Sequence, residues 1–302
     1  MIYRERKVGA LIVAYEPDIE NLIFLIERLT PQVDHIVVVD NSSNISLLKI
    51  SKRVNKIISL NENLGIATAQ NIGIKYLLTS GFQDVILFDQ DSMPSESMVS
   101  DLLAGRERVS KLGIDVVAVG PLHIDQDDFT ECVYVDTSKG KVEILIPSDV
   151  KKGGNNWVSC DFLIASGCLI SKESLDVVGL MEDELFIDCV DIEWGYRALS
   201  KGLHCIAILD AKMYHKIGDK PLTILGRNLT THSPVRHYYF YRNFYSLLKR
   251  NYIPSCWKRH TLVKSAIQAV AFSLFLSPRL KQLEFIIKGV FHGIIGCKGK
   301  YE

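Results

Sequence analysis

Two acidic clusters in the sequence have a spacing that suits metal binding or proton transfer. The first, Asp89-Gln90-Asp91, directly follows an apolar run at residues 85–88. Carboxylates one residue apart reach a common point in a turn, and hard cations such as Mg²⁺ or Mn²⁺ take such oxygen ligands together with phosphate oxygens. The alternative is a solvated turn at a strand end, where Asp side chains bond to their own backbone.

The second cluster comprises Asp188, Asp191 and Glu193, around the start of a predicted helix over residues 191–200. A helix N-terminus favours negative charge, so a purely structural capping role stays open. A general base needs a carboxylate within reach of a substrate hydroxyl, and apolar neighbours raise its pKa. Glu193 stands four residues before Arg197, the spacing of an ion pair on a helix, which leaves Asp191 as the freer carboxylate.

The first half of the chain alternates strand and helix signals that would position these clusters. Short apolar runs predict buried strands at residues 8–15, 35–39, 56–60, 85–88 and 116–119. Helical spacing predicts helices from residue 17, across residues 65–78, and after Ser95 as a cap. This alternation indicates an α/β fold with a mostly parallel, doubly wound sheet. Such sheets bind ligands at the carboxyl ends of their strands, where residues 40–42 and 89–91 lie.

The second half differs in pattern and in charge. A hairpin is expected over residues 132–146 and a further strand at residues 204–209, and the pattern becomes helical after residue 235. Residues 236–302 carry twelve Lys or Arg against two Glu, a net charge of +10, so residues 1–235 carry −10. A separation this sharp predicts two regions, 1–235 and 236–302, with different roles.

Composition and motifs exclude several classes of protein. With 47% hydrophobic and 23% charged residues, the chain is neither disordered nor fibrous. Its longest apolar stretch, residues 266–276, is shorter than the roughly 20 residues of a membrane span, and no signal peptide is expected. The seven cysteines are scattered without a CxxC pair, so reduced thiols are expected. The absence of GxSxG, GxGxxG and P-loop motifs disfavours hydrolases, dinucleotide oxidoreductases and kinases.

Seven segments together resemble glycosyltransferase family 2, and within it the bacterial rhamnosyltransferases that build surface polysaccharides. They fall in the family's order between residues 8 and 250: VGALIVAYEP, HIVVVDNSS, NENLGIATAQNIGI, VILFDQDSMP, ASGCLISKESLDVVGLMEDELFIDCVDIEWGYRALSKG, MYHKIGD and SPVRHYYFYRNFYSLLKR. The resemblance implies the glycosyltransferase A fold, a mostly parallel Rossmann-like sheet with helices on both faces, followed by a C-terminal helical segment. Residues 1–235 would then form a nucleotide-sugar-binding catalytic domain.

The same resemblance implies a role for individual residues. Asp191 takes the place of the base that deprotonates the acceptor, and Asp40 that of the residue that recognises the nucleotide base. Asp89, Asp91 and His215 stand where the family holds the metal, Mg²⁺ or Mn²⁺. The implied donor-binding residues are Asp40, Asn63, Asp89 and Arg236, and those on the acceptor side or in positioning roles are Asp188, Glu193 and Trp194.

Some of these implied roles have alternatives. Val190 stands where many relatives have the glutamate of a Glu-Asp pair, which leaves Asp188 as a rival base. His215 alternatively is a hydrogen-bonded surface or core residue. Arg236, His237 and Arg242 are further candidate contacts to the acceptor or the diphosphate.

The C-terminal region combines aromatic, basic and apolar residues. Residues 236–250 interleave aromatic and basic side chains, and one helical face predicts packing; without a recognised nucleic-acid module we expect no nucleic-acid partner. After residue 252, apolar blocks with isolated Lys and Arg suit amphipathic helices on an anionic membrane surface. The alternatives are an ordinary helical subdomain or the interface of a homo-oligomer.

The implied function is metal-dependent transfer of L-rhamnose from dTDP-L-rhamnose to a lipid-linked saccharide in O-antigen or capsule synthesis. The protein would be cytoplasmic and peripheral on the inner face of the cell membrane. The cation would stabilise the leaving diphosphate, and a carboxylate on the opposite face of the sugar would take the acceptor proton, giving inversion. The alternatives are a family 2 transferase for another nucleotide sugar, or an inactive nucleotide-sugar-binding membrane scaffold.

Overall fold

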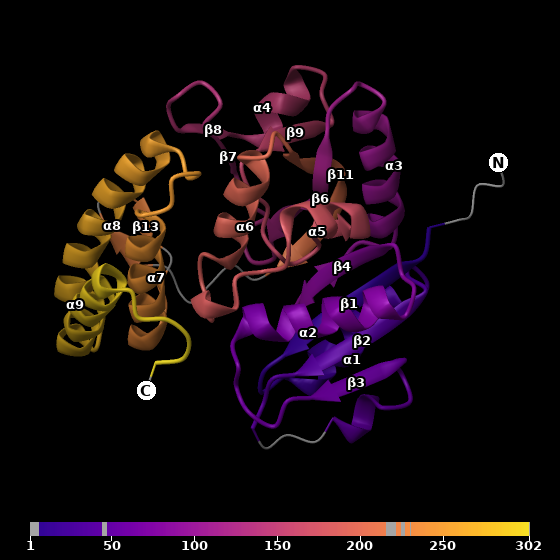
Figure 1. The fold of residues 1–302 in the computed structure, drawn as a ribbon, viewed down its shortest axis with the longest axis horizontal. Coiled ribbons are helices and arrows are strands. Elements are labelled where there is room, and N and C mark those ends of the chain that lie inside the picture. Colours follow the sequence, from indigo (N-terminus) through magenta and orange to yellow (C-terminus); the bar gives the residue numbers. More distant parts are fainter. Residues whose placement is uncertain (1–5, 44–46, 216–221, 225–226, 230, 302) are drawn as a thin grey trace.

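The computed structural model of the chain describes residues 6–43, 47–215, 222–224, 227–229 and 231–301, and its centre is a nine-stranded mixed sheet (Figure 1). The strand order is β3-β2-β1-β4-β10-β6-β11-β5, with β9 paired to β11. The strands of this sheet are β1 (Val8–Ala14), β2 (His35–Asp40), β3 (Lys56–Ser59), β4 (Asp84–Asp89), β5 (Met93–Pro94), β6 (Val116–Asp125), β9 (Trp157–Cys160), β10 (Leu169–Ser171) and β11 (His204–His215). Two hairpins lie outside it, β7 (Tyr134–Asp136) with β8 (Glu143–Leu145), and β12 (Leu222–Ile224) with β13 (Arg227–Leu229).

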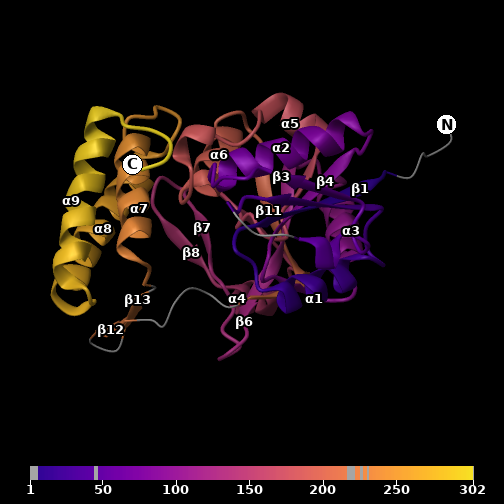
Figure 2. The same cartoon turned by 90° about the horizontal axis from the view of Figure 1, so that it is seen from below.

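Helices cover both faces of the sheet, as the resemblance implied. One core lies under α2 (Ile66–Thr79), α5 (Lys172–Val178) and α6 (Val190–Leu199), and the other under α1 (Ile19–Leu29) and α3 (Met98–Ser110). Figure 2 shows α2 and α5 on one side of the sheet and α1 on the other. The remaining elements of this part are α4 (Pro147–Lys152) and the 3-10 helices η1 (Leu48–Ile50) and η2 (Asp183–Leu185).

The predicted parallel pairing is present in β3, β2, β1 and β4, while the other half of the sheet is mixed. The short β10 runs antiparallel between β4 and β6, and β5 and β9 both run antiparallel to β11. Helix α3 begins at Met98 with Ser97 as its N-cap, and not at the predicted cap, Ser95. The reason is that the Ser95 N–H donates to the carbonyl of Lys212 in β11, which keeps Ser95 in the strand layer.

The carboxyl ends of β2, β1 and β4 meet at one edge of the sheet. Ala14 is in register with Asp40, and Val13 with Asp89, so the two aspartates flank the end of β1. The fold therefore brings together two polar segments that lie about fifty residues apart in the sequence, at the edge where such sheets bind ligands.

Three helices follow the sheet and pack beside α6: α7 (Pro234–Leu247), α8 (Ser255–Phe275) and α9 (Arg279–Ile295) (Figure 1). Helix α9 lies very close to α7 because two glycines face it. A Cβ on Gly289 would stand 2.6 Å from the carbonyl oxygen of Tyr238, and one on Gly293 would stand 2.5 Å from that of Arg242. None of the described helices combines the length and hydropathy that crossing a bilayer requires.

A similar close approach sets α2 on β1. A Cβ on Gly73 would overlap the buried Leu11 side chain. We expect Gly73→Val to lower the free energy of unfolding by about 1–3 kcal/mol, because overpacking forces the helix away from the strand. Urea titration measures this. The control Lys75→Val places the same side chain at an exposed position of the same helix and should cost about 0.7 kcal/mol or less; equal losses would contradict the close packing.

Candidate active site

The Asp89-Gln90-Asp91 turn leaves the end of β4 with its backbone fixed from two sides. Gln90 reaches back to β1, where its Oε1 accepts the N–H of Tyr15 at 2.7 Å and its Nε2 donates to the Tyr15 carbonyl at 3.1 Å. On the other side, Ser166 Oγ accepts the N–H of Asp89 at 3.3 Å. Asp89 is half-buried and Asp91 is exposed. The middle residue of the acidic turn therefore serves to hold its shape.

A polar network beside this turn contains Asp40 and Asn63, the two residues implied to bind the nucleotide. The Asp40 carboxylate is buried and accepts the N–H of Ser42 at 3.0 Å. Asn41 Nδ2 donates to Asn63 Oδ1 at 3.1 Å, and the same oxygen accepts the N–H of Gly65 at 3.0 Å. The structure thus links Asp40 and Asn63 through neighbouring residues at the ligand-binding edge of the sheet.

The loop before α6 carries Asp188 on a strained backbone. Phe186, Asp188 and Cys189 have φ values of 63°, 64° and 62°. This left-handed region is uncommon for residues other than glycine, and each such residue costs about 1–3 kcal/mol. The loop keeps this shape only because contacts from other elements outweigh that cost.

Those contacts come from α7 on one side and α2 on the other. Asn243 Nδ2 donates to three loop carbonyls, those of Leu185 at 2.8 Å, Ile187 at 2.7 Å and Asp188 at 2.9 Å. At the start of α2, the Ile66 N–H donates to the carbonyl of Phe186 at 2.7 Å. A Cβ on Gly65 would stand 2.6 Å from that same carbonyl, and its φ of 86° also favours glycine.

Two candidate contacts on α7 have structural roles instead. Arg242 is buried, and its Nη2 donates to the Leu185 carbonyl at 2.9 Å. His237 is also buried, stacks on Phe272 with ring centroids 4.4 Å apart, and hydrogen-bonds to Gln282. Neither side chain is placed to touch an acceptor or a diphosphate, because each is already enclosed by its own packing.

Asp191 lies in the first turn of α6 with its carboxylate half-buried. Burial raises the pKa of Asp191 to about 6; hydrogen bonds from backbone N–H groups oppose the shift, and the charges of Asp188 and Asp89 add to it. Asp191 therefore experiences the charge of one carboxylate from each acidic cluster. A carboxylate with a pKa near neutrality is well suited to accept a proton.

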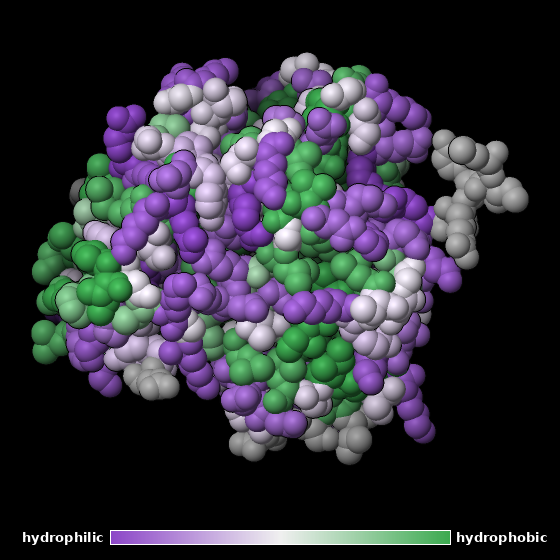
Figure 3. Space-filling model, in the orientation of Figure 1, coloured by the Kyte–Doolittle hydropathy of each residue, from purple (hydrophilic) through white to green (hydrophobic). Residues whose placement is uncertain are grey.

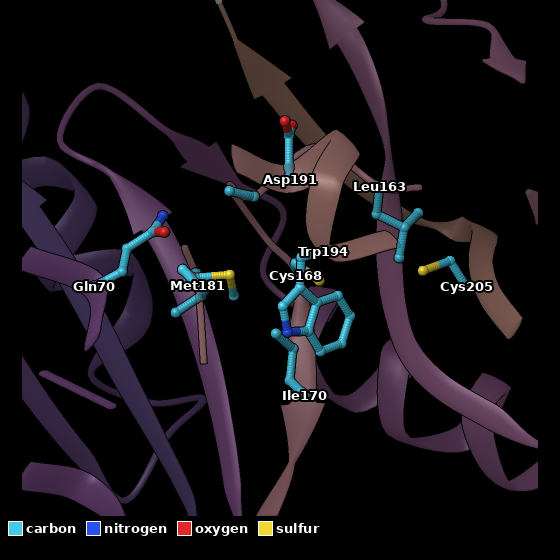
Figure 4. A pocket seen from close by; sticks show the side chains of 10 residues that line it. Gln70, Leu163, Cys168, Ile170, Met181, Asp191, Trp194 and Cys205 are labelled. Carbon is cyan, nitrogen blue, oxygen red and sulfur yellow. The ribbon is translucent and has the colours of Figure 1, made fainter. Parts of the chain in front are cut away.

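An apolar cavity of about 20 Å³ behind Asp191 explains this desolvation. Figure 4 shows the Asp191 carboxylate at one end of the cavity, with Trp194 below it and Gln70 reaching in from the side. The cavity has room for about one water molecule and is too small for a sugar. It is therefore a packing gap next to the carboxylate and not the place where a substrate binds. Trp194 is buried, and its Nε1 donates to the Gly179 carbonyl at 2.9 Å. Trp194 is therefore held in place by its packing and this hydrogen bond.

The two other carboxylates of this cluster are each engaged by a cation. Glu193 is buried and accepts Nε and Nη2 of Arg197 at 2.9 and 2.8 Å, as well as the hydroxyl of Tyr252 at 2.6 Å. Asp188 Oδ1 accepts Nη2 of Arg236 at 2.7 Å. Within the described residues, Asp191 forms no ion pair.

The acidic turn supplies two carboxylates for a cation. No group of three or more His, Cys, Asp or Glu side chains gathers as a metal site in the described part of the chain. The backbone of His215 ends β11 next to Tyr214, which pairs with Met93 just beyond the turn, but its side chain lies outside the described residues. Mg²⁺ is usually bound by one or two carboxylates together with substrate phosphates and water. Asp89 and Asp91 therefore fit a cation whose coordination a diphosphate completes.

The sequence analysis did not identify the residues that support the site only through structural hydrogen bonds. Besides Asn243, Asn71 on α2 donates through Nδ2 to the Met181 carbonyl at 2.8 Å and accepts the Met181 N–H at 2.9 Å. The sequence feature that could have identified both residues is an amide side chain at a position on the apolar face of a helix. Such a residue must find buried partners, but the sequence does not say which.

Comparison with known proteins gives the family of the chain. Residues 10–178 match the family model of glycosyl transferase family 2. The chain is 36% identical to the dTDP-rhamnosyl transferase RfbF of Shigella flexneri, over 97% of this chain and 96% of that protein. It is 26% identical to the galactofuranosyltransferase GlfT1 of Mycolicibacterium smegmatis, over 75% of this chain and 78% of that protein.

Solved structures share the fold at low sequence identity. The crystal structure of GalNAc-T7 with UDP, GalNAc and Mn²⁺ matches with a TM-score of 0.59 and 14% identity, over 83% of this chain and 50% of that chain. The crystal structure of S. aureus TarS matches with a TM-score of 0.51 and 14% identity, over 88% of this chain and 44% of that chain. The chain thus spans half or less of the length of either. The glycosyltransferase A fold implied by the sequence is confirmed.

The role of Asn243 in holding the loop can be tested. We expect Asn243→Leu to lower the free energy of unfolding by about 1–3 kcal/mol, because the Ile187 and Asp188 carbonyls lose the side-chain donor of Asn243 while the Leu185 carbonyl keeps Arg242. Hydrogen exchange should also speed up at residues 185–189. The control Asn156→Leu removes an exposed amide whose one hydrogen bond among the described residues is to Asp210, and it should change neither quantity. Unchanged exchange in the loop of the Asn243 variant would contradict this role.

The burial of Asp191 predicts a pH-dependent cost to stability. Its pKa is raised from 3.8 to about 6 in the folded state, so the folded protein binds this proton more tightly and loses stability as pH rises between those values. Asp191→Asn should therefore be more stable than the parent by about 1–3 kcal/mol at about pH 8, with the gain vanishing near pH 4. Urea titration at both pH values measures this, with exposed Asp127→Asn as control. A gain independent of pH would contradict the assignment.

Proposed function

The chain belongs to glycosyl transferase family 2, and on that premise we propose that it transfers L-rhamnose from dTDP-L-rhamnose, with inversion, to a lipid-linked saccharide in O-antigen or capsule synthesis. The observation that carries the proposal is the placement of Asp40 and Asp89 at one edge of the sheet, on either side of the end of β1. The raised pKa of Asp191, to which the charge of Asp89 contributes, supports it. The choice of donor is supported by the rhamnosyl transferase relative, which matches nearly the whole chain.

In this proposal the donor lies at the carboxyl ends of β1, β2 and β4. Asp40 and Asn63 bind the nucleoside, and Arg236 lies next to the acidic loop on the donor side. Asp89 and Asp91, with His215 as a further candidate, hold Mg²⁺ or Mn²⁺, which when bound stabilises the negative charge of the leaving diphosphate.

On the acceptor side, Asp191 takes the proton of the attacking hydroxyl. Its raised pKa and its lack of an ion pair among the described residues favour it over Asp188, which is bound to Arg236. Asp188 Oδ1 is already occupied by the hydrogen bond from Arg236. Glu193 acts as a positioning residue, because its oxygens are already engaged by Arg197 and Tyr252.

The lipid-linked acceptor would place the reaction at the inner face of the cell membrane, with the protein cytoplasmic and peripheral. In this arrangement residues 1–235 form the catalytic domain and residues 236–302 the region that meets the membrane. The net charge of +10 in that second region supports this division, because anionic lipids attract basic residues.

A second candidate is the same reaction with another nucleotide sugar. The galactofuranosyltransferase relatives favour it, since they match three quarters or more of the chain. Hydrolysis of a panel of nucleotide sugars, with and without chelator, separates the candidates. An inactive scaffold would release no nucleoside diphosphate from any donor.

The base assignment predicts distinct outcomes for two conservative variants. Asp191→Asn should bind dTDP-L-rhamnose with a near-normal Kd but lose about 10²–10⁴-fold in transfer rate, because the proton has no acceptor. Asp188→Asn, the matched control, should retain more activity. The measurements are isothermal titration with donor and a transfer assay with a synthetic lipid-linked acceptor. Full transfer by the Asp191 variant with loss in the Asp188 variant would reverse the assignment.

The metal assignment predicts a different pattern. Asp89→Ala and Asp91→Ala should each weaken donor binding in the presence of Mn²⁺, and the difference from the parent should shrink when the metal is chelated. Asp127→Ala, at an exposed turn, should leave donor binding unchanged. Equal Kd values with and without metal in the parent protein would count against a bound cation.

A further inference from the structure

The C-terminal helices expose an unusual concentration of large apolar side chains. Of the twenty-two large hydrophobic side chains that are exposed among the described residues, twelve lie within residues 262–295. Figure 3 shows them as a green area at the left edge of the molecule, over α8 and α9. A concentration of this kind marks a surface that meets another apolar partner, whereas singly scattered apolar residues carry no such meaning.

Nine of these twelve residues form one stripe along each helix. On α8 the stripe follows helical spacing: Val263, Ile267, Val270 and Leu274. On α9 it does so again: Leu280, Leu283, Ile287, Phe291 and Ile294. Each helix therefore has two faces that carry apolar or small residues. The described residues of the protein cover the inner face and leave the outer face exposed.

Both inner faces pack against α7, so both stripes point away from it. On α8, the Ser265 carbonyl accepts the hydroxyl of Tyr241, and Trp257 packs edge-on against Phe244 with ring centroids 5.8 Å apart. On α9, Gly289 faces the backbone of α7. Because α8 and α9 also contact one another, the two stripes make a single surface, the α8–α9 face.

Basic residues without acidic partners border this face. Helices α8 and α9 carry six Lys or Arg and one acidic residue, Glu284, which pairs with Lys288. Four exposed cations form no ion pair within the part of the chain that the structure describes: Arg259, Lys264, Arg279 and Lys281. Long basic side chains at the edge of an apolar stripe extend to lipid headgroups while the stripe enters the acyl boundary.

We propose that the α8–α9 face is a membrane-docking surface that lies flat in the interface of an anionic bilayer. Charge decides between this occupant and a second copy of the chain. Two copies would bring their unpaired cations together, which opposes association, whereas each basic residue near an anionic leaflet strengthens binding about fivefold. None of the described helices is apolar and long enough to span the bilayer, so the face binds from one side.

This proposal deepens the proposed function by naming the surface that meets the lipid. Its test measures lipid binding of the full-length protein without donor or acceptor, so that its failure and a failure of the proposed activity are distinguishable. The probes are vesicles of phosphatidylcholine alone and of phosphatidylcholine with phosphatidylglycerol, at low and high salt. Cosedimentation gives the partition coefficient, and analytical ultracentrifugation of the same samples gives the oligomeric state.

Two variants and two matched controls probe the apolar and the charged parts of the face. The triple variant Ile267→Gln, Ile287→Gln and Phe291→Gln changes side chains that are 64%, 58% and 57% exposed, so the fold should persist. Its control is Leu112→Gln, a side chain 64% exposed elsewhere on the molecule. The charge variant is Arg259→Gln with Lys281→Gln, and its control is Lys52→Gln with Lys75→Gln.

We expect the parent to bind the anionic vesicles, and more weakly at high salt. The triple variant should bind at least about tenfold more weakly, the charge variant should lose most of its preference for phosphatidylglycerol, and both controls should match the parent. No binding of the parent to anionic vesicles would overturn the proposal, as would parent-like binding of the triple variant. A parent dimer that the triple variant dissociates, without vesicle binding, would make the face an interface between copies.

Discussion

The site depends on a short stretch of backbone that would not hold its shape alone. Phe186, Asp188 and Cys189 all have positive φ, at a combined cost of several kcal/mol. The amide of Asn243 and the first N–H groups of α2 satisfy the carbonyls of this stretch. Because a buried carbonyl that loses its hydrogen bond raises the free energy of the folded state, these contacts fix where α6 begins and hence the direction of the Asp191 side chain.

The charges around Asp191 follow from that placement. Asp188 in the loop and Asp89 at the sheet edge each contribute a negative charge that acts on Asp191, and the apolar side chains around the cavity limit its hydration. All three effects favour the protonated form of Asp191. At a pH above its pKa the ionised carboxylate therefore lowers the stability of the folded protein. Such a cost is typical of a group kept for chemistry. The Asp188–Arg236 ion pair limits the repulsion by neutralising the nearer neighbour.

Much of the fold and the chemistry-bearing residues could be predicted from the sequence, because local patterns report them. Buried strands ending in Asp40 and Asp89 predicted the shared edge, and the spacing of Glu193 and Arg197 predicted their ion pair. The direction of β10 was not predictable, since three residues carry no signal for orientation and their partners decide it. The strained loop was hidden for the same reason: Phe186 and Cys189 have no local preference for positive φ, and the side chain of Asn243 that holds them lies more than fifty residues away in the sequence.

Helix α7 packs between the loop before α6 and the two C-terminal helices that carry the proposed docking surface. On one side, Asn243 and Arg242 of α7 hydrogen-bond to the loop at residues 185–189. On the other side, α7 packs against α8 and α9. The backbone beyond α9 also returns to the site, because Arg242 Nη1 donates to the carbonyl of Gly299. Removing residues after α7 would therefore uncover α7 and take a partner from Arg242, so truncation would disturb the loop before α6 and the proposed membrane-docking surface together. Substitutions on the outward stripes of α8 and α9 are the better way to separate the two effects, since those side chains are exposed and not packed under α7.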